Sequence, residues 1–142
     1  MYNTNPSAKD ESRLFGLIGY PLEQSFSKKY FDKKIKEEGL RNYRFENFSI
    51  KEIDELKNII ANNPDLRGLA VTIPYKQSVL SYLTTTENIP AGLRACNCIK
   101  IIDGKLFGYN TDYIGFQKSF EPLVQPHHKN ALLLGNGGST EA

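Results

Sequence analysis

Short apolar runs alternate with segments of helical periodicity along most of this 142-residue chain. Residues 14–20 and 69–73 have the length and composition of buried strands, and Pro74 ends the second of them. Residues 27–38 and 53–60 repeat their apolar side chains three and four positions apart, as one face of a helix does. This alternation predicts an α/β fold with a mostly parallel sheet that helices flank.

Residues with strong local preferences set the expected boundaries of these elements. Ser27 is expected to cap the first helix and Gly39 to end it. The run from Ser49 to Glu52 fits a capping box for the second helix. Asp103 and Gly104 predict a tight hairpin. The remaining expected elements are a strand at 43–48, helices from Lys76 and at 87–93, hairpin strands at 98–102 and 105–109, and a helix at 113–120.

The end of the chain resembles the opening of a dinucleotide-binding unit. An apolar run at 131–134 precedes a turn and helix start with Gly135, Gly137, Gly138 and Ser139. Glycines let a backbone approach a pyrophosphate, which then binds the N–H groups of a helix. We expect a tail at 1–12 that is mobile, an α/β domain at 13–121, a crossover linker at 122–130 and a truncated dinucleotide-binding domain at 131–142. Such a fragment is expected to be inactive alone.

Composition disfavours several classes of function. The formal net charge is +2 with both signs interspersed, so no nucleic-acid surface is indicated, and the basic stretch at 28–36 reads as a solvated helix face. No apolar run or signal peptide indicates a membrane or secretion, which favours the cytoplasm. Cys96 and Cys98 are two apart in a strand-like run, which favours free thiols over a disulfide or a zinc half-site; no metal is expected.

Three loops at expected strand ends carry polar side chains, where α/β sheets bind ligands. Ser25 and Ser27 suit a carboxylate or phosphate, or serve only as a turn residue and an N-cap. Lys76, with Thr72 before it, fits either an acid/base or a solvated lysine. Asp112 fits either a functional carboxylate or a plain helix cap. Spacing alone leaves each of these alternatives open.

Five short motifs that follow one another along the chain give further information about its function. They are Gly-x-Pro-x-x-x-Ser-x-Ser from Gly19, Val-Thr-x-Pro-x-Lys from Val71, Asn97 after a turn, Gly-x-Asn-Thr-Asp from Gly108 and Gly-x-Gly-Gly from Gly135. From about residue 14 to its end, the chain resembles the shikimate dehydrogenase family. The resemblance implies an N-terminal α/β substrate domain, a C-terminal Rossmann domain, and reduction of 3-dehydroshikimate to shikimate with NADPH in aromatic amino-acid biosynthesis.

The resemblance also implies roles for single residues. Lys76 and Asp112 would be the catalytic pair, and the glycine loop would bind NADP. A lysine ammonium can stabilise the alkoxide that hydride transfer creates and give it a proton. The side chains implied to bind the substrate are Ser25, Ser27, Thr72, Asn97 and Asp112.

Two positions depart from the family pattern: Ala70 stands where the family has asparagine, and Arg94 where it has glycine. Two rival functions stay open. One is a related dehydrogenase that uses quinate or NAD, because the residue that reads the adenosine ribose is not in the chain. The other is a metabolite-sensing module without catalysis, which would need the serines but not a proton donor. The expected partner is a small molecule, and the expected state a monomer or weak homodimer.

Overall fold

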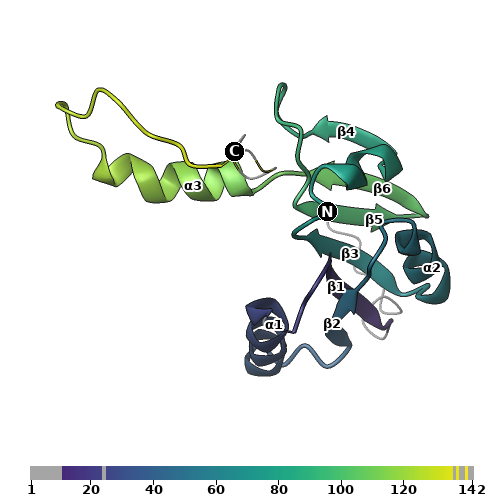
Figure 1. Cartoon of the computed structure of the whole chain (residues 1–142). Helices are drawn as coiled ribbons and strands as arrows, with labels where there is room; N and C mark the ends of the chain where they lie inside the picture. The colour runs from purple at the N-terminus through teal and green to yellow at the C-terminus, as the bar shows by residue number, and fades with distance from the viewer. Residues whose placement is uncertain (1–10, 24, 136, 138–139, 141–142) are drawn as a thin grey trace, which may run out of the picture.

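A single six-stranded sheet organises the computed structural model, which describes residues 11–23, 25–135, 137 and 140. Its order is β2-β1-β3-β5-β6-β4 (Figure 1). The predicted α/β class is confirmed. The strands are β1 (Arg13–Gly19), β2 (Tyr43–Ser49), β3 (Leu66–Val71), β4 (Thr85–Asn88), β5 (Cys98–Ile102) and β6 (Lys105–Tyr109). The helices are α1 (Phe26–Glu37), α2 (Glu55–Asn62) and α3 (Asp112–Phe120), with 3-10 helices η2 (Ser78–Tyr82) and η3 (Glu121–Leu123).

Strand direction brings several loops to one edge of the sheet. The pairs β1–β2, β1–β3 and β4–β6 are parallel, whereas β5 runs antiparallel to both β3 and β6. Cys98, the first residue of β5, lies opposite both Ala70 near the end of β3 and Tyr109 at the end of β6. The carboxyl ends of β1, β3 and β6 and the start of β5 therefore lie together along one edge of the sheet, the edge that runs across the ends of the strands.

Each face of the sheet packs against different helices. On one face α2 and η2 close the main core, which includes Ile18, Leu56 and Val79. On the other face α1 covers β1 and β2, where the rings of Phe31 and Phe45 stack with centroids 4.5 Å apart. Fully burying one such side chain stabilises a fold by about 1.5–3 kcal/mol. These two layers hold the sheet edge in place.

The local signals for the hairpin and the first helix end are confirmed. Asp103 has a φ of 50° and Gly104 of 73°, the left-handed pair that a type I′ turn requires between β5 and β6. Gly39 has a φ of 65° after α1, as a glycine that ends a helix does.

Two predicted helix caps were wrong. The N-cap of α1 is Ser25 rather than Ser27, because the Ser25 hydroxyl accepts the Ser27 N–H at 3.3 Å and α1 already begins at Phe26. Ser49 ends β2 and makes no capping box with Glu52. The carboxylate of Glu55 instead accepts the N–H groups of Lys51 and Glu52, at 2.9 and 3.0 Å, which moves the start of α2 to Glu55.

Three other predicted elements differ. The segment after Lys76 forms the 3-10 helix η2, not an α-helix. The helix expected at 87–93 is absent; β4 pairs there with the free edge of β6, and Pro90 and Gly92 (φ 89°) then interrupt regular structure. Residues 131–134 form no strand and expose Leu132, because no described strand lies beside them to pair with.

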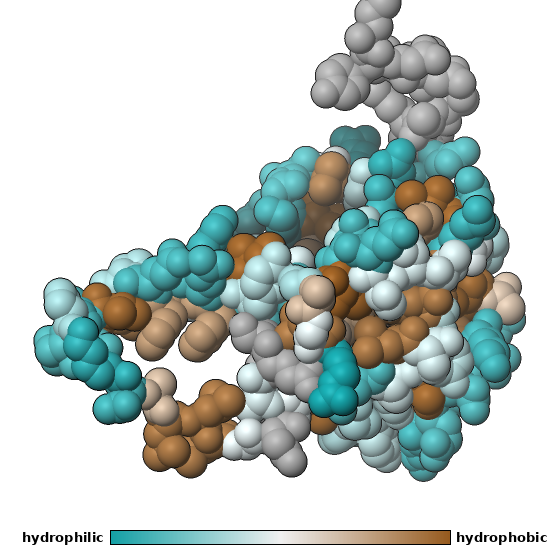
Figure 2. Space-filling view, turned by 90° about the horizontal axis from the view of Figure 1, so that it is seen from above, coloured by the Kyte–Doolittle hydropathy of each residue, from teal (hydrophilic) through white to brown (hydrophobic). Residues whose placement is uncertain are grey.

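Helix α3 and the segment after it project away from the sheet (Figure 1). Figure 2 shows apolar side chains along this arm. The large exposed ones are Ile114, Phe116, Phe120, Leu123, Val124, Leu132, Leu133 and Leu134. None of the helices in the described part of the chain has the length and apolar character needed to cross a membrane.

Of the predicted mobile tail, residues 1–10 lie outside the described residues. Ser12 belongs to the fold, since its hydroxyl donates to Asp65 at 2.7 Å. Cys96 and Cys98 are both free thiols; Cys96 is buried and Cys98 half-buried, and this burial raises the pKa of each thiol. Residues 28–36 carry surface ion pairs, such as that of Lys34 with Glu38 at 2.8 Å, as a solvated helix face does.

Candidate active site

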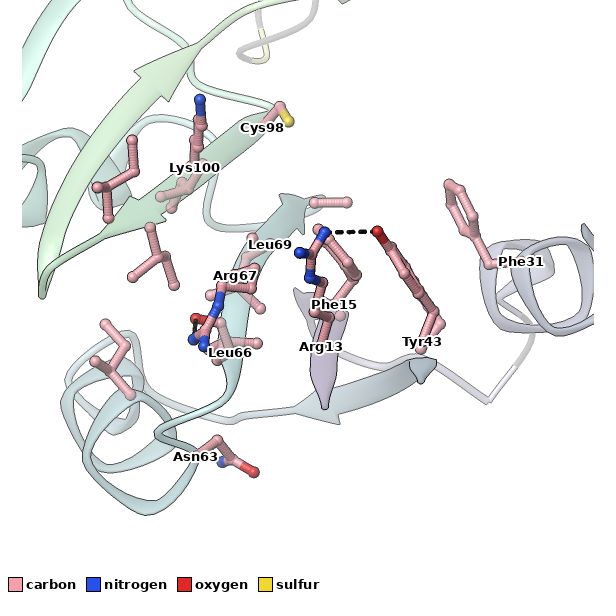
Figure 3. Close-up of a pocket in the computed structure, with 18 of the residues that line it drawn as sticks. Arg13, Phe15, Phe31, Tyr43, Asn63, Leu66, Arg67, Leu69, Cys98 and Lys100 are labelled. Atoms are coloured by element: carbon pink, nitrogen blue, oxygen red, sulfur yellow. Dashed lines mark hydrogen bonds between the residues drawn. The ribbon is translucent and has the colours of Figure 1, made fainter. Parts of the chain in front are cut away.

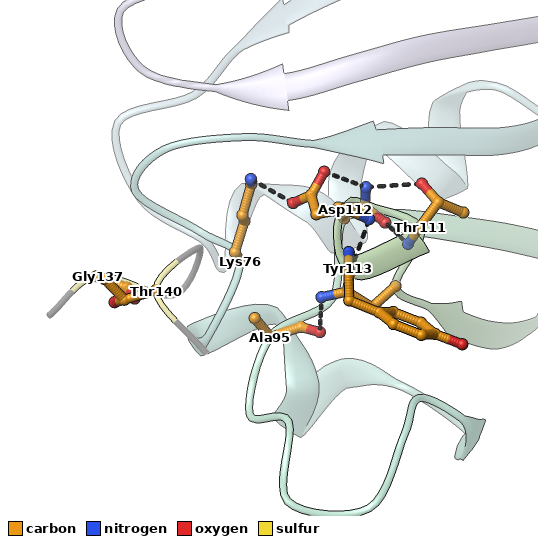
Figure 4. Close-up of polar contacts among 9 residues, drawn as sticks. Lys76, Ala95, Thr111, Asp112, Tyr113, Gly137 and Thr140 are labelled. Atoms are coloured by element: carbon orange, nitrogen blue, oxygen red, sulfur yellow. Dashed lines mark hydrogen bonds and ion pairs between the residues drawn. The ribbon is translucent and has the colours of Figure 1, made fainter. Parts of the chain in front are cut away.

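Lys76 and Asp112 meet at the edge of the sheet where β3 and β6 end (Figure 4). The Lys76 Nζ donates to Asp112 Oδ2 at 2.7 Å, and their side chains are 17% and 33% exposed. A charge-assisted hydrogen bond of this length fixes the ammonium group at a place that is still partly exposed to solvent. The structure thus brings together the two residues that the family resemblance implies as a pair.

Asn97 holds the other oxygen of the same carboxylate. Its Nδ2 donates to Asp112 Oδ1 at 2.7 Å and to Thr111 Oγ1 at 2.8 Å, while its Oδ1 accepts the Thr111 N–H at 2.8 Å. The backbone of Asn97 is bound on both sides, to the Val71 N–H at 2.8 Å and to the Tyr109 carbonyl at 3.1 Å. Asn97 therefore orients Asp112 from a position that the sheet itself determines.

Three of the predicted substrate-binding residues line a small hollow in the surface. Ser25, Ser27 and Thr72 surround a space of about 360 Å³ at the start of α1. The hydroxyl of Ser25 also caps α1, so it serves the helix as well as the hollow. Hydroxyl groups beside a helix N-terminus suit an anionic ligand such as a carboxylate.

Thr72 connects this hollow to the charged pair. Its N–H donates to the Ile18 carbonyl at 3.0 Å, and its carbonyl accepts the Tyr75 N–H at 2.9 Å in the turn that leads to Lys76. The Tyr75 hydroxyl donates to the Ile50 carbonyl at 2.7 Å inside the core, and burial raises the pKa of this phenol. The loop that carries Lys76 is therefore anchored at both ends.

The predicted cofactor loop is described only in part. Gly135 has a φ of 122°, which glycine adopts without strain, and an added Cβ on Gly137 would meet no atom within 4 Å. Gly138 and Ser139 lie outside the described residues. Because residues 131–135 are exposed and in no strand, the described residues do not build a cradle for a pyrophosphate.

Comparison with known proteins identifies the family of this chain. The sequence model of a family described as the shikimate dehydrogenase substrate binding domain matches residues 17–99, more than half of the chain. The chain belongs to this family. A shikimate dehydrogenase (NADP(+)) of Methanococcus maripaludis is 36% identical over 138 residues, which cover 93% of this chain and 48% of the relative.

Solved structures of the family share the fold. A shikimate dehydrogenase of Peptoclostridium difficile matches with a TM-score of 0.78 and 27% identity, over 91% of this chain and 48% of the other. One of Thermus thermophilus, solved in complex with shikimate, matches with a TM-score of 0.76 and 26% identity, over 91% and 49%. The chain thus spans about half the length of the relatives it matches.

The two departures from the family pattern lie at the margin of this site. Ala70 is in β3 opposite Cys98 and packs beside the core that α1 closes. Arg94 is exposed in the loop that leads to the buried residue Ala95.

The site also contains Asn110, which belongs to the Gly-x-Asn-Thr-Asp motif but to which the sequence assigned no role. It is the one buried residue, at 3% exposure, among the polar and charged residues of the described part of the chain. Its Oδ1 accepts the Asp112 N–H at 2.9 Å, so Asn110 caps α3, which the Thr111 side chain does not do. The signal was an asparagine two positions before the first helical residue, a typical place for a cap.

A larger hollow lies elsewhere, on the face of the sheet that carries α1, beside the helix and over strands that it does not cover (Figure 3). It is a groove of about 1320 Å³ over β3 and β5, with Phe15 and Cys98 in its lining and Arg67 and Lys100 among its basic residues. None of the residues predicted to bind substrate lines it. The chemistry therefore points to the smaller site at the sheet edge.

Proposed function

We propose that this chain supplies the substrate-binding part of an NADP-dependent shikimate dehydrogenase, which reduces 3-dehydroshikimate to shikimate. The observation that carries the proposal is the ion pair of Lys76 with Asp112 at 2.7 Å, beside Asn97 and near the hollow that Ser25 lines. A plain anion-binding module has no need of a lysine held by a carboxylate. This pair therefore favours catalysis over sensing.

Recognition of the substrate is assigned to both parts of the site. Ser25 and Ser27 would donate to its carboxylate, and the first N–H groups of α1 would add the positive end of the helix dipole. Thr72, Asn97 and Asp112 would bind the ring hydroxyls. Carboxylate and hydroxyls are thus read by separate groups along one sheet edge.

In the reaction, a reduced nicotinamide supplies the hydride when it is bound. The carbonyl oxygen of the substrate then gains negative charge, which the Lys76 ammonium stabilises and neutralises with its proton. Asp112 holds the Lys76 ammonium in place through one carboxylate oxygen, and Asn97 holds the other oxygen of that carboxylate. Two hydrogen-bonded oxygens leave Asp112 one orientation toward the ring.

The proposal includes the predicted division of the chain into domains. Residues 13–121 would form the substrate-binding domain, 122–130 the crossover, and 131–142 the first part of a dinucleotide-binding domain. Gly135, Gly137, Gly138 and Ser139 would contribute to NADP binding together with the half of the relatives that this chain does not match. The state we propose is a monomer or weak homodimer in the cytoplasm.

Calorimetric titration of the 142-residue chain tests recognition, with shikimate, quinate and a ring analogue that lacks the carboxylate as ligands. We expect shikimate to bind, quinate to bind less tightly, and the analogue not to bind. A chain joined to a complete cofactor-binding half is expected to oxidise shikimate with NADP in preference to NAD. A preference for quinate or NAD would support the first rival function. Binding without turnover in the joined protein would support the sensor instead.

A further inference from the structure

Asn110 connects the backbones of the two residues that form the ion pair. We infer that Asn110 is a positioning residue that holds Lys76 and Asp112 in register through a single shared peptide group. The inference rests on the proposed roles of Lys76 and Asp112 for its meaning in catalysis. The contacts that carry it are independent of any ligand.

On one side, Asn110 determines where Asp112 begins its helix. Its Oδ1 accepts the N–H of Asp112 at 2.9 Å and that of Tyr113 at 3.4 Å. An asparagine in this position satisfies N–H groups that have no partner inside a helix. The backbone of Asp112 is therefore bound to a side chain that is itself buried.

On the other side, Asn110 reaches Lys76 through the peptide group between Ala95 and Cys96. The Asn110 Nδ2 donates to the Ala95 carbonyl at 2.8 Å. The N–H of the same peptide group, on Cys96, donates to the Lys76 carbonyl at 2.7 Å. Donor and acceptor at the two ends of one peptide group polarise each other, so the two bonds strengthen together.

The hydrogen bonds of this connection are buried, which makes them costly to break. Ala95 and Cys96 are both 0% exposed and Asn110 is 3% exposed, so water does not compete for these bonds. Leaving one of these buried groups without a partner carries a full desolvation penalty. The ion pair itself is partly exposed at 17% and 33%, and two flexible side chains alone would not define its place.

Asn97 and Asn110 thus divide the task between them. Asn97 orients the carboxylate of Asp112, whereas Asn110 sets the distance between the two backbones that carry the pair. A displacement of about 1 Å in a reacting group reduces a rate by about 100-fold. Asn110 therefore affects the rate of the reaction by positioning Lys76 and Asp112, without touching the substrate.

Two variants separate the two halves of the connection. Asn110→Ala removes both the donor and the acceptor, whereas Asn110→Asp keeps an acceptor for the Asp112 N–H and loses the donor to Ala95. Asn63→Ala is the matched control, because the Asn63 Nδ2 also donates to a backbone carbonyl, that of Ile59 at 2.7 Å, but at the end of α2.

Amide hydrogen exchange of the 142-residue chain, followed by NMR, tests the connection without any ligand. We expect the Cys96 amide to exchange roughly tenfold faster in both Asn110 variants, as the loss of about one hydrogen bond implies. The Asp112 amide should do so only in Asn110→Ala. Unchanged exchange at Cys96 in either folded variant overturns the inference. If neither variant folds, the wild type decides: fast exchange of the Cys96 or Asp112 amide there overturns it.

Turnover of the chain joined to a cofactor-binding half gives the second readout. Asn110→Ala should lower kcat by about 100-fold with a smaller change in KM, while Asn63→Ala should leave kcat within about twofold. If Asn63→Ala lost as much kcat as Asn110→Ala, the result would mean that Asn110 acts only on stability. If Lys76→Ala leaves turnover intact while the amide results hold, the proposed function fails and the connection between the backbones stands.

Discussion

The Lys76 ammonium donates to the Asp112 carboxylate at 2.7 Å although 36 positions separate the two residues in sequence. The order of the sheet explains this contact. Lys76 follows β3, Asp112 follows β6, and β5 lies between these strands with its first residue opposite both. Both side chains are partly exposed, so replacing either should affect the chemistry more than the fold.

Lys76→Ala should reduce kcat by roughly two to four orders of magnitude, the usual contribution of a general acid/base, with a smaller change in KM. The reason is that the alkoxide loses both its nearby positive charge and its proton donor. Steady-state kinetics of the chain joined to a cofactor-binding half measures the effect.

The control for Lys76→Ala is Lys57→Ala. Lys57 also pairs with an aspartate, Asp54 at 3.5 Å, but both side chains are largely exposed, at 72% and 77%. Its loss should leave kcat unchanged. Turnover of Lys76→Ala within a few-fold of the wild type would show that another group gives the proton.

Ser25→Ala and Ser27→Ala should each weaken shikimate binding by about 1–3 kcal/mol, because a carboxylate loses a donor. Only Ser25→Ala should also lower the free energy of unfolding, by about 0.5–2 kcal/mol, since the Ser25 hydroxyl caps α1. Calorimetry and urea unfolding separate the two effects. Equal losses of affinity for ligands with and without a carboxylate would assign both serines to the fold alone.

Gly19→Ala should destabilise the fold by about 1–3 kcal/mol and weaken shikimate binding. An added Cβ there would lie 2.5 Å from Thr72 Cγ2 and 2.9 Å from the Ile73 carbonyl oxygen, so the loop that carries Thr72 must move. Gly115→Ala is the control. It meets no atom within 4 Å inside α3 and should stabilise by about 0.5–1 kcal/mol. A Gly19→Ala variant with normal affinity would mean that Thr72 tolerates displacement.

Asp65 should make stability depend on acid pH. Hydrogen bonds from Ser12 and from Arg44 hold the pKa of its carboxyl below the ordinary value of 3.8. A lowered pKa in the folded state stabilises the fold above that ordinary value, and the contribution is lost as the pH falls through the lower one. At pH 7 the free energy of unfolding of Asp65→Asn, measured with urea, should thus be lower than that of the wild type by about 0.2–1 kcal/mol. At acid pH, where Asp65 is protonated, the two free energies of unfolding should be equal. A gap that stays constant with pH would contradict this origin.

Elements that depend on neighbours in sequence could be predicted. Asp103 and Gly104 prefer the left-handed conformations of a type I′ turn, so the hairpin of β5 and β6 follows from two residues and the flanking alternation. The apolar repeat of α2 likewise predicted which face would pack, and its Leu56 is 0% exposed. Motif order predicted Lys76 and Asp112, and the structure brings these two together.

Only the tertiary structure decided the features that need a distant partner. The strand β4 forms because the edge of β6 was open to it, and residues 131–134 stay outside the sheet because no described strand lies beside them. Asn110 looked like part of a loop until the fold placed the Ala95 carbonyl at 2.8 Å from its amide. The sequence by itself determined the hairpin, the approximate positions of β1, β2, β3, β5 and β6, and the candidate residues of the site. Hydrogen bonds between segments that are far apart in sequence decided which side chains meet, because their geometry depends on the order and direction of strands in the sheet.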